Sequence, residues 1–317
     1  MADELQTHQP SIEALAADEL WQVQLVDHSP ELATTIKLLA EQVSQHDHVS
    51  PLNEQALRIL AGQLPGQHLV AVHDSPSGAQ QVLGYAQVDT SDNSVQLFVL
   101  PQARRHGIGR ALGELAARQV DSPDFWSFGT LPAARQLGAT MGLQPVRGLL
   151  KMALDPSQVE VASPGPPPEG ITVTTFTPAD IDDFVELNAL AFAHHPEQGR
   201  MSRQDVEDKV DEDWFDAQGL FFARDDQGRM LGFHWTKVVT EDNDAGSRLI
   251  GEVYVIGVHP FEHGRGLGRH LLAVGLAHLL ARGSQLIELY VEADQTRVVQ
   301  MYENAGFTEA LRDTRWS

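Results

Sequence analysis

Apolar and polar residues alternate along the second half of the chain in a pattern that predicts strands interleaved with helices. The run IGEVYVIGV (250–258) is almost continuously apolar, which predicts a strand buried on both faces. The segments LFFARDD and RMLGFHWTKVV favour a hairpin with its turn at 225–228. We expect an α/β (α+β) fold in which each half of the chain has a mixed central sheet flanked by helices.

The chain contains an internal repeat. SVQLFVLPQARRHGIGRAL (94–112) parallels VYVIGVHPFEHGRGLGRHL (253–271), and Gly266 follows Gly107 by 159 positions. A period of this length indicates the duplication of a whole domain, because solenoid repeats are far shorter.

A proline-rich segment separates the two copies. Residues 155–170 (DPSQVEVASPGPPPEG) hold five prolines and two glycines, which suit an extended linker. A chain of 317 residues also suits two domains of roughly 150 residues each. We therefore expect an N-terminal domain at 1–154, a linker at 155–170 and a C-terminal domain at 171–317.

Composition excludes several classes of protein. The formal net charge of −22 argues against sequence-independent binding to nucleic acid or to an anionic membrane. The chain has no cysteine, and the sequence shows neither a signal peptide nor an apolar run long enough to span a membrane, so we expect a cytoplasmic protein. The histidines of HDH (46–48) and HH (194–195) lack the spacing of a metal site, and we expect no metal.

The glycine-rich motif that follows a strand in each copy is the main chemical signal. Glycines at the start of a helix leave backbone N–H groups open to a close ligand, and a helix N-terminus favours an anion. A tight turn is the alternative for a single copy, but two copies flanked by arginine or histidine favour a phosphate site. The spacing fits neither the dinucleotide-binding fingerprint nor the GxxxxGK phosphate loop.

The strand–motif–helix element, with YENAGF at 302–307, resembles the GCN5-related N-acetyltransferases (GNATs). In the N-terminal copy Arg104 fills the first motif position, whereas His263 replaces the usual glutamine or arginine in the other. The resemblance implies two tandem GNAT-like domains and acetyl-CoA as co-substrate, bound by its pyrophosphate. The residues implied in its binding are Leu97, Phe98, Val99, Arg104, Arg105, His106, Gly107, Ile108, Gly109, Ile256, Gly257, Val258, His263, Gly264, Arg265, Gly266, Leu267, Gly268, Arg269, Gln295, Thr296, Arg297, Val298, Val299 and Gln300.

Acetyl transfer to an amine needs a base for the ammonium proton and benefits from an acid for the leaving thiolate. Glu252 precedes the apolar part of the strand at 250–258, and the resemblance makes it the general base, directly or through a water. Tyr302 lies where many GNATs keep their general acid, and it can also pack beside Phe307 as a core residue. The corresponding N-terminal residues are Asn93 and Gly138, so we expect one catalytic domain, the second.

The segments HPEQG, GFHWTKV, GEVYVIGV and LYVEAD together resemble tandem GNATs that acetylate the cysteinyl amine of a cysteine–glucosamine–inositol conjugate. This resemblance implies that Glu252 also contacts the acceptor, together with Glu54, Glu197, Lys237 and Tyr290. Other roles remain open for three of them: a favourable acid in a first helical turn for Glu54, an exposed strand position for Lys237 and a half-buried aromatic for Tyr290.

Two other functions remain open on the sequence alone. One is acetyl transfer to a different small amine, and the other is a CoA-binding sensor or scaffold without turnover. A pure binder needs neither Glu252 nor Tyr302, which favours the enzyme. We expect a monomer that acts on a small molecule.

Overall fold

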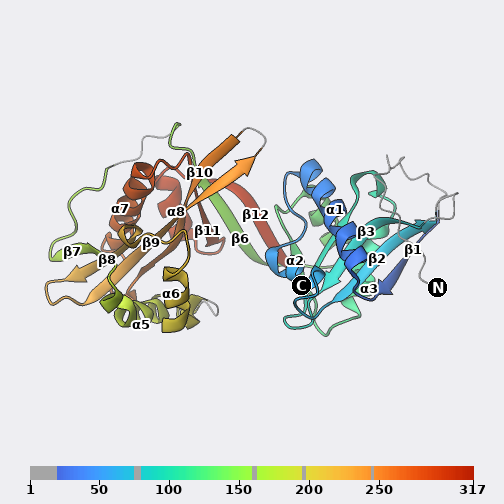
Figure 1. Cartoon of the computed structure of the whole chain (residues 1–317), viewed down its shortest axis with the longest axis horizontal. Helices are drawn as coiled ribbons and strands as arrows, with labels where there is room; N and C mark the ends of the chain where they lie inside the picture. Colours follow the sequence, from blue (N-terminus) through green and yellow to red (C-terminus); the bar gives the residue numbers. More distant parts are fainter. Residues whose placement is uncertain (1–19, 75–79, 159–162, 195–197, 244–245) are drawn as a thin grey trace. The chain divides into compact units, whose positions relative to one another are not determined.

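The computed structural model describes residues 20–74, 80–158, 163–194, 198–243 and 246–317 (Figure 1). The chain forms two compact units. The N-terminal unit comprises the residues up to Leu149 together with Leu311–Ser317, and the C-terminal unit comprises Leu150–Ala310. Each unit has a mixed sheet flanked by helices, which confirms the predicted α/β class.

In the N-terminal unit the strand order is β1-β2-β3-β4-β5-β12, and the pair β4–β5 is parallel while the other pairs are antiparallel. The elements are β1 (Trp21–Val26), α1 (Pro30–Asp47), α2 (Glu54–Leu60), β2 (Gln67–Asp74), β3 (Gln80–Val88), β4 (Ser94–Val99), the 3-10 turn η1 (Pro101–Ala103), α3 (Ile108–Ala117), β5 (Asp124–Ser127) and α4 (Pro132–Met141). Two strands are divided between the units: β6 (Pro145–Leu154) and β12 (Thr308–Trp316).

Helix α3 packs closely on the sheet of the N-terminal unit because Gly84 of β3 leaves room for it. A Cβ at Gly84 would lie 3.1 Å from Leu112 of α3. Side chains of the sheet hold α2: Gln87 donates to the Ala56 carbonyl at 3.0 Å, and Gln96 accepts from the Asn53 amide at 3.0 Å. Both glutamines are buried, so these hydrogen bonds satisfy groups that water cannot reach.

In the C-terminal unit the strand order is β6-β11-β10-β9-β8-β7, with a parallel pair β10–β11. The elements are β7 (Ile171–Thr175), η2 (Pro178–Asp180), α5 (Ile181–Ala191), η3 (Gln198–Arg200), α6 (Arg203–Val210), η4 (Ala217–Gly219), β8 (Leu220–Asp225), β9 (Met230–Asn243), β10 (Gly246–Val258), η5 (Pro260–Glu262), α7 (Leu267–Ala281), β11 (Leu286–Glu292) and α8 (Thr296–Asn304). The predicted hairpin is confirmed, since β8 and β9 pair antiparallel and the Gly228 N–H donates to the Asp225 carbonyl at 2.9 Å.

Helices cover both faces of the C-terminal sheet (Figure 1). Phe184 of α5 and Val206 of α6 pack with Phe222 of β8 in one apolar cluster. Leu276 of α7 and Tyr302 of α8 belong to another cluster, on the opposite face. The strand β10 contributes Val255 to the first cluster and Val253 to the second, so its apolar run packs on both faces, as the sequence predicts.

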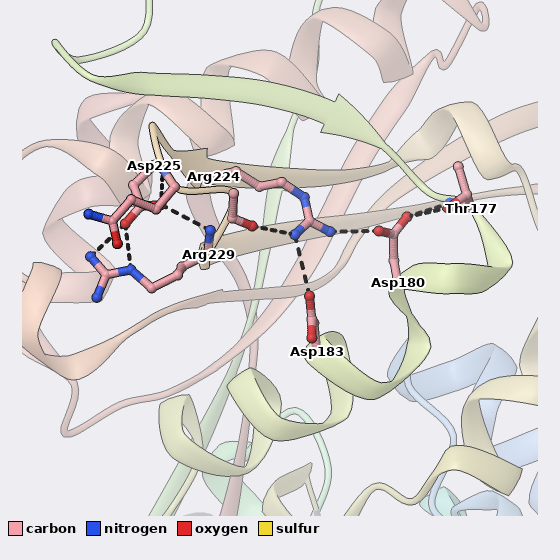
Figure 2. A network of polar contacts seen from close by, with 8 residues as sticks. Thr177, Asp180, Asp183, Arg224, Asp225 and Arg229 are labelled. Atoms are coloured by element: carbon pink, nitrogen blue, oxygen red, sulfur yellow. Dashed lines mark hydrogen bonds and ion pairs between the residues drawn. The ribbon is translucent and has the colours of Figure 1, made fainter.

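Arg224 joins the start of α5 to the β8–β9 hairpin (Figure 2). Its guanidinium donates to Asp180 at 2.6 Å, to Asp183 at 3.4 Å and to the Gly228 carbonyl at 2.8 Å. Asp180 in turn accepts from the Thr177 amide at 2.7 Å, which caps η2. The contacts of Arg224 with the two aspartates join segments more than forty positions apart, and Arg224 and Asp180 are separated by 44 positions.

Candidate active site

Each glycine motif forms the N-terminus of a helix that has no side-chain cap. In α7 the first internal hydrogen bond runs from the His270 N–H to the Gly266 carbonyl at 3.0 Å, so the preceding N–H groups have no helical partner. Gly264 and Gly266 have φ angles of +80° and +85°, and no atom lies within 4 Å of a Cβ built at either. This loop can therefore admit an anion against its backbone.

The N-terminal copy has the same backbone shape with a different residue. Helix α3 begins after Gly107, whose φ is +84°. Arg105 stands at the position of Gly264 and also adopts a positive φ, of 74°. This conformation is unfavourable for a residue with a side chain, so the surrounding loop must hold Arg105 in it.

The first side chain of each motif turns back to the preceding strand. Arg104 Nε donates to the Val99 carbonyl at 3.0 Å, and His263 Nε2 donates to the Val258 carbonyl at 3.2 Å. The two residues thus make equivalent contacts 159 positions apart, although one is arginine and the other histidine. The first motif position braces the loop in both copies, and the backbone N–H groups are the donors left for an anion.

Arg104 is also engaged by a carboxylate. Its Nη1 and Nη2 donate to the two oxygens of Asp47, the last residue of α1, at 2.9 and 2.6 Å. Burial opposes ionisation of Asp47, but the hydrogen bonds from Arg104 and His46 outweigh it and hold the pKa of this carboxyl below its ordinary value. Arg265 in the other copy pairs with Glu262 at 2.6 Å.

The parallel strands beside each loop separate. In the described part of the chain, β10 pairs with β11 at three positions ending at Glu252, and β4 pairs with β5 at two positions ending at Val95. The predicted cofactor residues Ile256–Val258 and Leu97–Val99 lie beyond these pairs, so a ligand can reach their backbone groups from the side of the missing partner.

A cavity of about 540 Å³ opens where the strands of the N-terminal unit separate. His106 and Ile108 lie outside its lining: Ile108 is buried in the core, and His106 Nδ1 donates to the Arg104 carbonyl at 2.9 Å. The predicted cofactor residues that do line the cavity are Leu97, Phe98, Val99, Arg104, Arg105, Gly107 and Gly109.

In the C-terminal unit, α8 lies beside the first turn of α7, which follows the glycine loop. A Cβ at Gly268 would be 3.6 Å from Val258 and 3.8 Å from Met301. Residues 295–300, which the resemblance assigns to the cofactor, form the cap and the first turns of this helix. The strand end, the loop and α8 of this unit are thus brought together.

Glu252 belongs to a row of charged side chains that crosses four strands. It is paired in register with Lys237 on β9 and with Glu288 on β11, and Lys151 on β6 forms an ion pair with Glu288 at 2.7 Å. Burial raises the pKa of Glu252, the charges of Lys237 and Lys151 oppose this rise, and Glu288 adds to it. A carboxylate with raised proton affinity is a better base at neutral pH.

Tyr302 lies in the core of the C-terminal unit, 4% exposed, and its ring meets that of Phe307 edge to face at 5.8 Å. The sequence predicts this packing, and the structure confirms it. Burial raises the pKa of Tyr302 above its ordinary value, so the phenol stays protonated at neutral pH. A protonated phenol can donate to a leaving thiolate.

The N-terminal unit has other residues at these two positions. Asn93 lies in the turn between β3 and β4 with a φ of 60°. Gly138 lies in α4, where a Cβ would be only 3.1 Å from Trp316. Neither residue can exchange a proton with a substrate at neutral pH.

Besides Glu252 on β10, two of the predicted substrate residues, Lys237 and Tyr290, lie on the sheet of the C-terminal unit. Lys237 Nζ lies 4.7 Å from the ring centroid of Trp214 and 5.5 Å from that of Tyr254, so cation–π contacts hold this side chain. Tyr290 is 51% exposed, and Lys151 Nζ lies 6.0 Å from its ring centroid.

The sequence also predicts Glu54 and Glu197 as substrate residues. Glu54 is the first residue of α2 in the N-terminal unit and is exposed, and the side chain of Asn53 caps the helix by accepting from the Ala56 amide at 2.8 Å. An acid at this position is also favourable for the helix itself. Glu197 lies outside the described residues.

Sequence reasoning missed Lys151, Glu288 and Trp214. Glu288 and Tyr290 alternate along β11 with the buried Ile287 and Leu289, so period-two alternation could have placed Glu288 on the face of Tyr290. Lys151 likewise alternates along β6 with the buried Leu150 and Met152, but its pairing with Glu288 depends on strand order, and the position of Trp214 depends on a loop.

The described residues contain no group of three or more histidine, aspartate or glutamate side chains placed to hold a metal ion. None of their helices is long and apolar enough to cross a membrane.

Comparison with known proteins agrees with this geometry. Residues 184–307 match the model of the acetyltransferase (GNAT) family. A GCN5-related N-acetyltransferase from Sphaerobacter thermophilus has the same fold, with a TM-score of 0.65 at 22% identity over 93% of this chain and 94% of that chain. A tandem GNAT protein from the clavulanic acid biosynthesis pathway gives 0.62 at 19% identity over 94% of this chain and 98% of that one. The fold and the loops therefore define a tandem GNAT protein.

A nearer relative specifies the family. The mycothiol acetyltransferase of Propionibacterium freudenreichii subsp. shermanii is 44% identical over 88% of this chain and 86% of its own length. The chain belongs to the mycothiol acetyltransferase family, which confirms the resemblance found in the sequence.

Proposed function

We propose that the protein transfers the acetyl group of acetyl-CoA to the cysteinyl amine of cysteinyl-glucosaminyl-inositol, giving mycothiol and CoA. Membership of the mycothiol acetyltransferase family supports the acceptor. The observation that carries the chemistry is the position of Glu252, a carboxylate of raised proton affinity at the point where β10 and β11 separate.

The reaction follows from three groups of the C-terminal unit. Glu252 accepts the proton of the cysteinyl ammonium, and the freed amine attacks the thioester carbonyl. The new C–N bond forms first, and the backbone N–H groups of Ile256–Val258 stabilise the charge on the carbonyl oxygen of the tetrahedral intermediate. When this intermediate collapses the C–S bond breaks, Tyr302 supplies the proton that the departing CoA thiolate takes up, and the second proton that the nitrogen loses returns to Tyr302.

The glycine loop fits the pyrophosphate of CoA. Its backbone N–H groups have no helical partner, and a Cβ at Gly264 or Gly266 would fill otherwise open space. Arg269 and residues 295–300 complete the cofactor side of the site. Among the predicted substrate residues of the C-terminal unit, Lys237 and Tyr290 serve the hydroxyl-rich acceptor.

The N-terminal unit is assigned a second acetyl-CoA site without turnover. Its cavity of about 540 Å³ and its uncapped α3 support binding, and Asn93 and Gly138 supply no acid or base. Titration calorimetry should give two acetyl-CoA molecules per chain, and a stoichiometry of one would remove this second site.

The proposed function is tested by CoA release from purified protein, with the cysteinyl conjugate beside a panel of other small amines. We expect turnover selective for the conjugate, and Glu252→Gln should lower it roughly 10²–10⁴-fold. Turnover only with another amine would keep the chemistry and replace the acceptor. Tight acetyl-CoA binding without turnover of any amine would leave the CoA-binding sensor.

A further inference from the structure

The charged row through Glu252 contains a second carboxylate that the proposed mechanism does not use. Glu288 is directly in register with Glu252 on the neighbouring parallel strand, and paired residues of adjacent strands project from the same face. Like charges at directly paired positions repel each other. An uncompensated glutamate pair here would therefore be unfavourable for the sheet.

Compensation comes from both ends of the row. Lys151 on β6 is ion-paired with Glu288 at 2.7 Å, and Lys237 on β9 is in register with Glu252 on its other side. The order across the strands is thus Lys151, Glu288, Glu252, Lys237. The side chains of Lys151 and Glu288 are only 24% and 20% exposed, so solvent screens this row incompletely.

The two carboxylates differ in what holds them. Glu288 has a lysine at ion-pair distance, whereas aromatic rings hold Lys237, which lies 4.7 Å from the centroid of Trp214. The Lys151–Glu288 pair therefore fixes one negative charge beside Glu252 without bonding to Glu252 itself. This arrangement leaves Glu252 available to a substrate.

We propose that Glu288, held by Lys151, is a positioning residue that sets the basicity of Glu252 for removal of the acceptor's ammonium proton. The inference rests on the proposed function, because it assumes that Glu252 is the base. The charged groups around Glu252 are Lys237 from β9, Glu288 from β11 and Lys151 from β6, while Lys209 of α6 lies over the Tyr254 ring at 5.9 Å.

The proposal predicts opposite effects for the two partners. Removal of the Glu288 charge weakens repulsion at Glu252 and lowers its pKa, whereas loss of the Lys151 charge raises it. The acidic limb of kcat/KM against pH reports the pKa of the base in the free enzyme. Glu288→Gln should therefore move this limb to lower pH, and Lys151→Met should move it to higher pH.

The experiment is the pH profile of kcat/KM for the cysteinyl conjugate, at saturating acetyl-CoA, in both variants and in the double variant. The limb of the double variant should lie between those of the single ones. Glu288→Asp keeps the charge and should keep the limb near its wild-type position. Glu207→Gln, which removes a surface glutamate paired with Arg203, is the control and should leave the limb unmoved.

A purely structural role for the pair predicts a different result. Both single variants would then lose stability and rate, with the limb unmoved, and this result would overturn the inference. Thermal melting of each variant identifies any that fail to fold, and if one single variant fails, the limb of the other, Lys151→Met or Glu288→Gln, provides the measurement. If Glu252→Gln is inactive while the acidic limbs of Glu288→Gln and Lys151→Met both stay at the wild-type position, only this inference fails. Full activity of Glu252→Gln would remove the inference and the proposed base together.

Discussion

The carboxylate of Asp47 accepts hydrogen bonds from Nη1 and Nη2 of Arg104, at 2.9 and 2.6 Å. This bidentate ion pair joins the end of α1 to the N-terminal glycine loop. The Asp47 side chain is only 9% exposed. Such bidentate pairs are strong because both partners are charged and their geometries match. The pair therefore stabilises the loop.

We expect Asp47→Asn to lower the free energy of unfolding by roughly 2 kcal/mol at pH 7, since a hydrogen bond to a charged group is lost. The pKa of Asp47 is lowered in the folded state, so its contribution is present above the ordinary value of 3.8 and disappears as the pH falls through the folded pKa. Urea denaturation at several pH values measures this. Glu114→Gln, which breaks the exposed pair with Arg110, should have a much smaller effect.

Tyr302→Phe should lower kcat roughly 10²-fold, because the variant keeps the ring beside Phe307 but loses the proton donor. Since burial raises the pKa of Tyr302, the wild-type rate should not fall at moderately alkaline pH through loss of this proton. Steady-state kinetics check both points. Tyr85→Phe, at a buried tyrosine of the N-terminal unit, should affect stability more than kcat, and an unchanged kcat in Tyr302→Phe would exclude the phenol as the acid.

His234 makes stability depend on pH. It is fully buried, its Nδ1 donates to the Leu271 carbonyl at 2.8 Å, and burial lowers its pKa from 6.5 to about 4. Below pH 6.5 the imidazole of His234 is protonated in the unfolded chain, whereas in the folded chain it stays neutral down to about pH 4. This histidine should therefore cost up to about 1.4 kcal/mol of stability per pH unit as the pH falls between these values.

The matched pair for this prediction is His234→Gln and His194→Gln. Only the first should flatten the dependence of the unfolding midpoint on pH, because His194 is exposed. Equal pH dependence in the wild type and in His234→Gln would show that another group titrates.

Arg224→Met should destabilise the C-terminal unit by about 2 kcal/mol, since it leaves Asp180 without its ionic partner in a site where both side chains are about 15% exposed (Figure 2). Arg229→Met removes a cation from the same hairpin, but Arg229 is 70% exposed, and we expect little change. Chemical denaturation of both variants tests this difference. Similar losses in the two would mean that the contacts of Arg224 with α5 contribute little.

Much of the fold follows from local pattern. The repeat, the two uncapped helices and the buried strand at 250–258 could all be predicted, because glycine spacing and apolar periodicity act over a few residues. Glu252 could be singled out because it is the one charged residue in the apolar run at 250–258, although the strand itself begins six residues earlier, at Gly246. The packing of Tyr302 beside Phe307 could also be predicted, because Tyr302 lies in the last turn of a helix and Phe307 follows the end of that helix.

The partners of these residues could not be predicted in the same way. Lys151 meets Glu288 only because β6 lies next to β11, and Asp47 meets Arg104 across 57 positions of sequence. Trp214 lies on a loop, where the apolar periodicity of helices and strands gives no information on the path of the chain. Contacts of this kind depend on strand order and on tertiary packing, so they need the structure.

The N-terminal unit includes the segment Leu311–Ser317, whose residues Thr314–Trp316 pair with Phe125–Ser127 of β5. Trp316 Nε1 also donates to Ser127 Oγ at 2.8 Å, across 189 positions of sequence. During translation β5 leaves the ribosome long before its partner does, so this edge of the sheet stays open while the C-terminal unit is being made. The unit that is synthesised first is therefore the last to be completed.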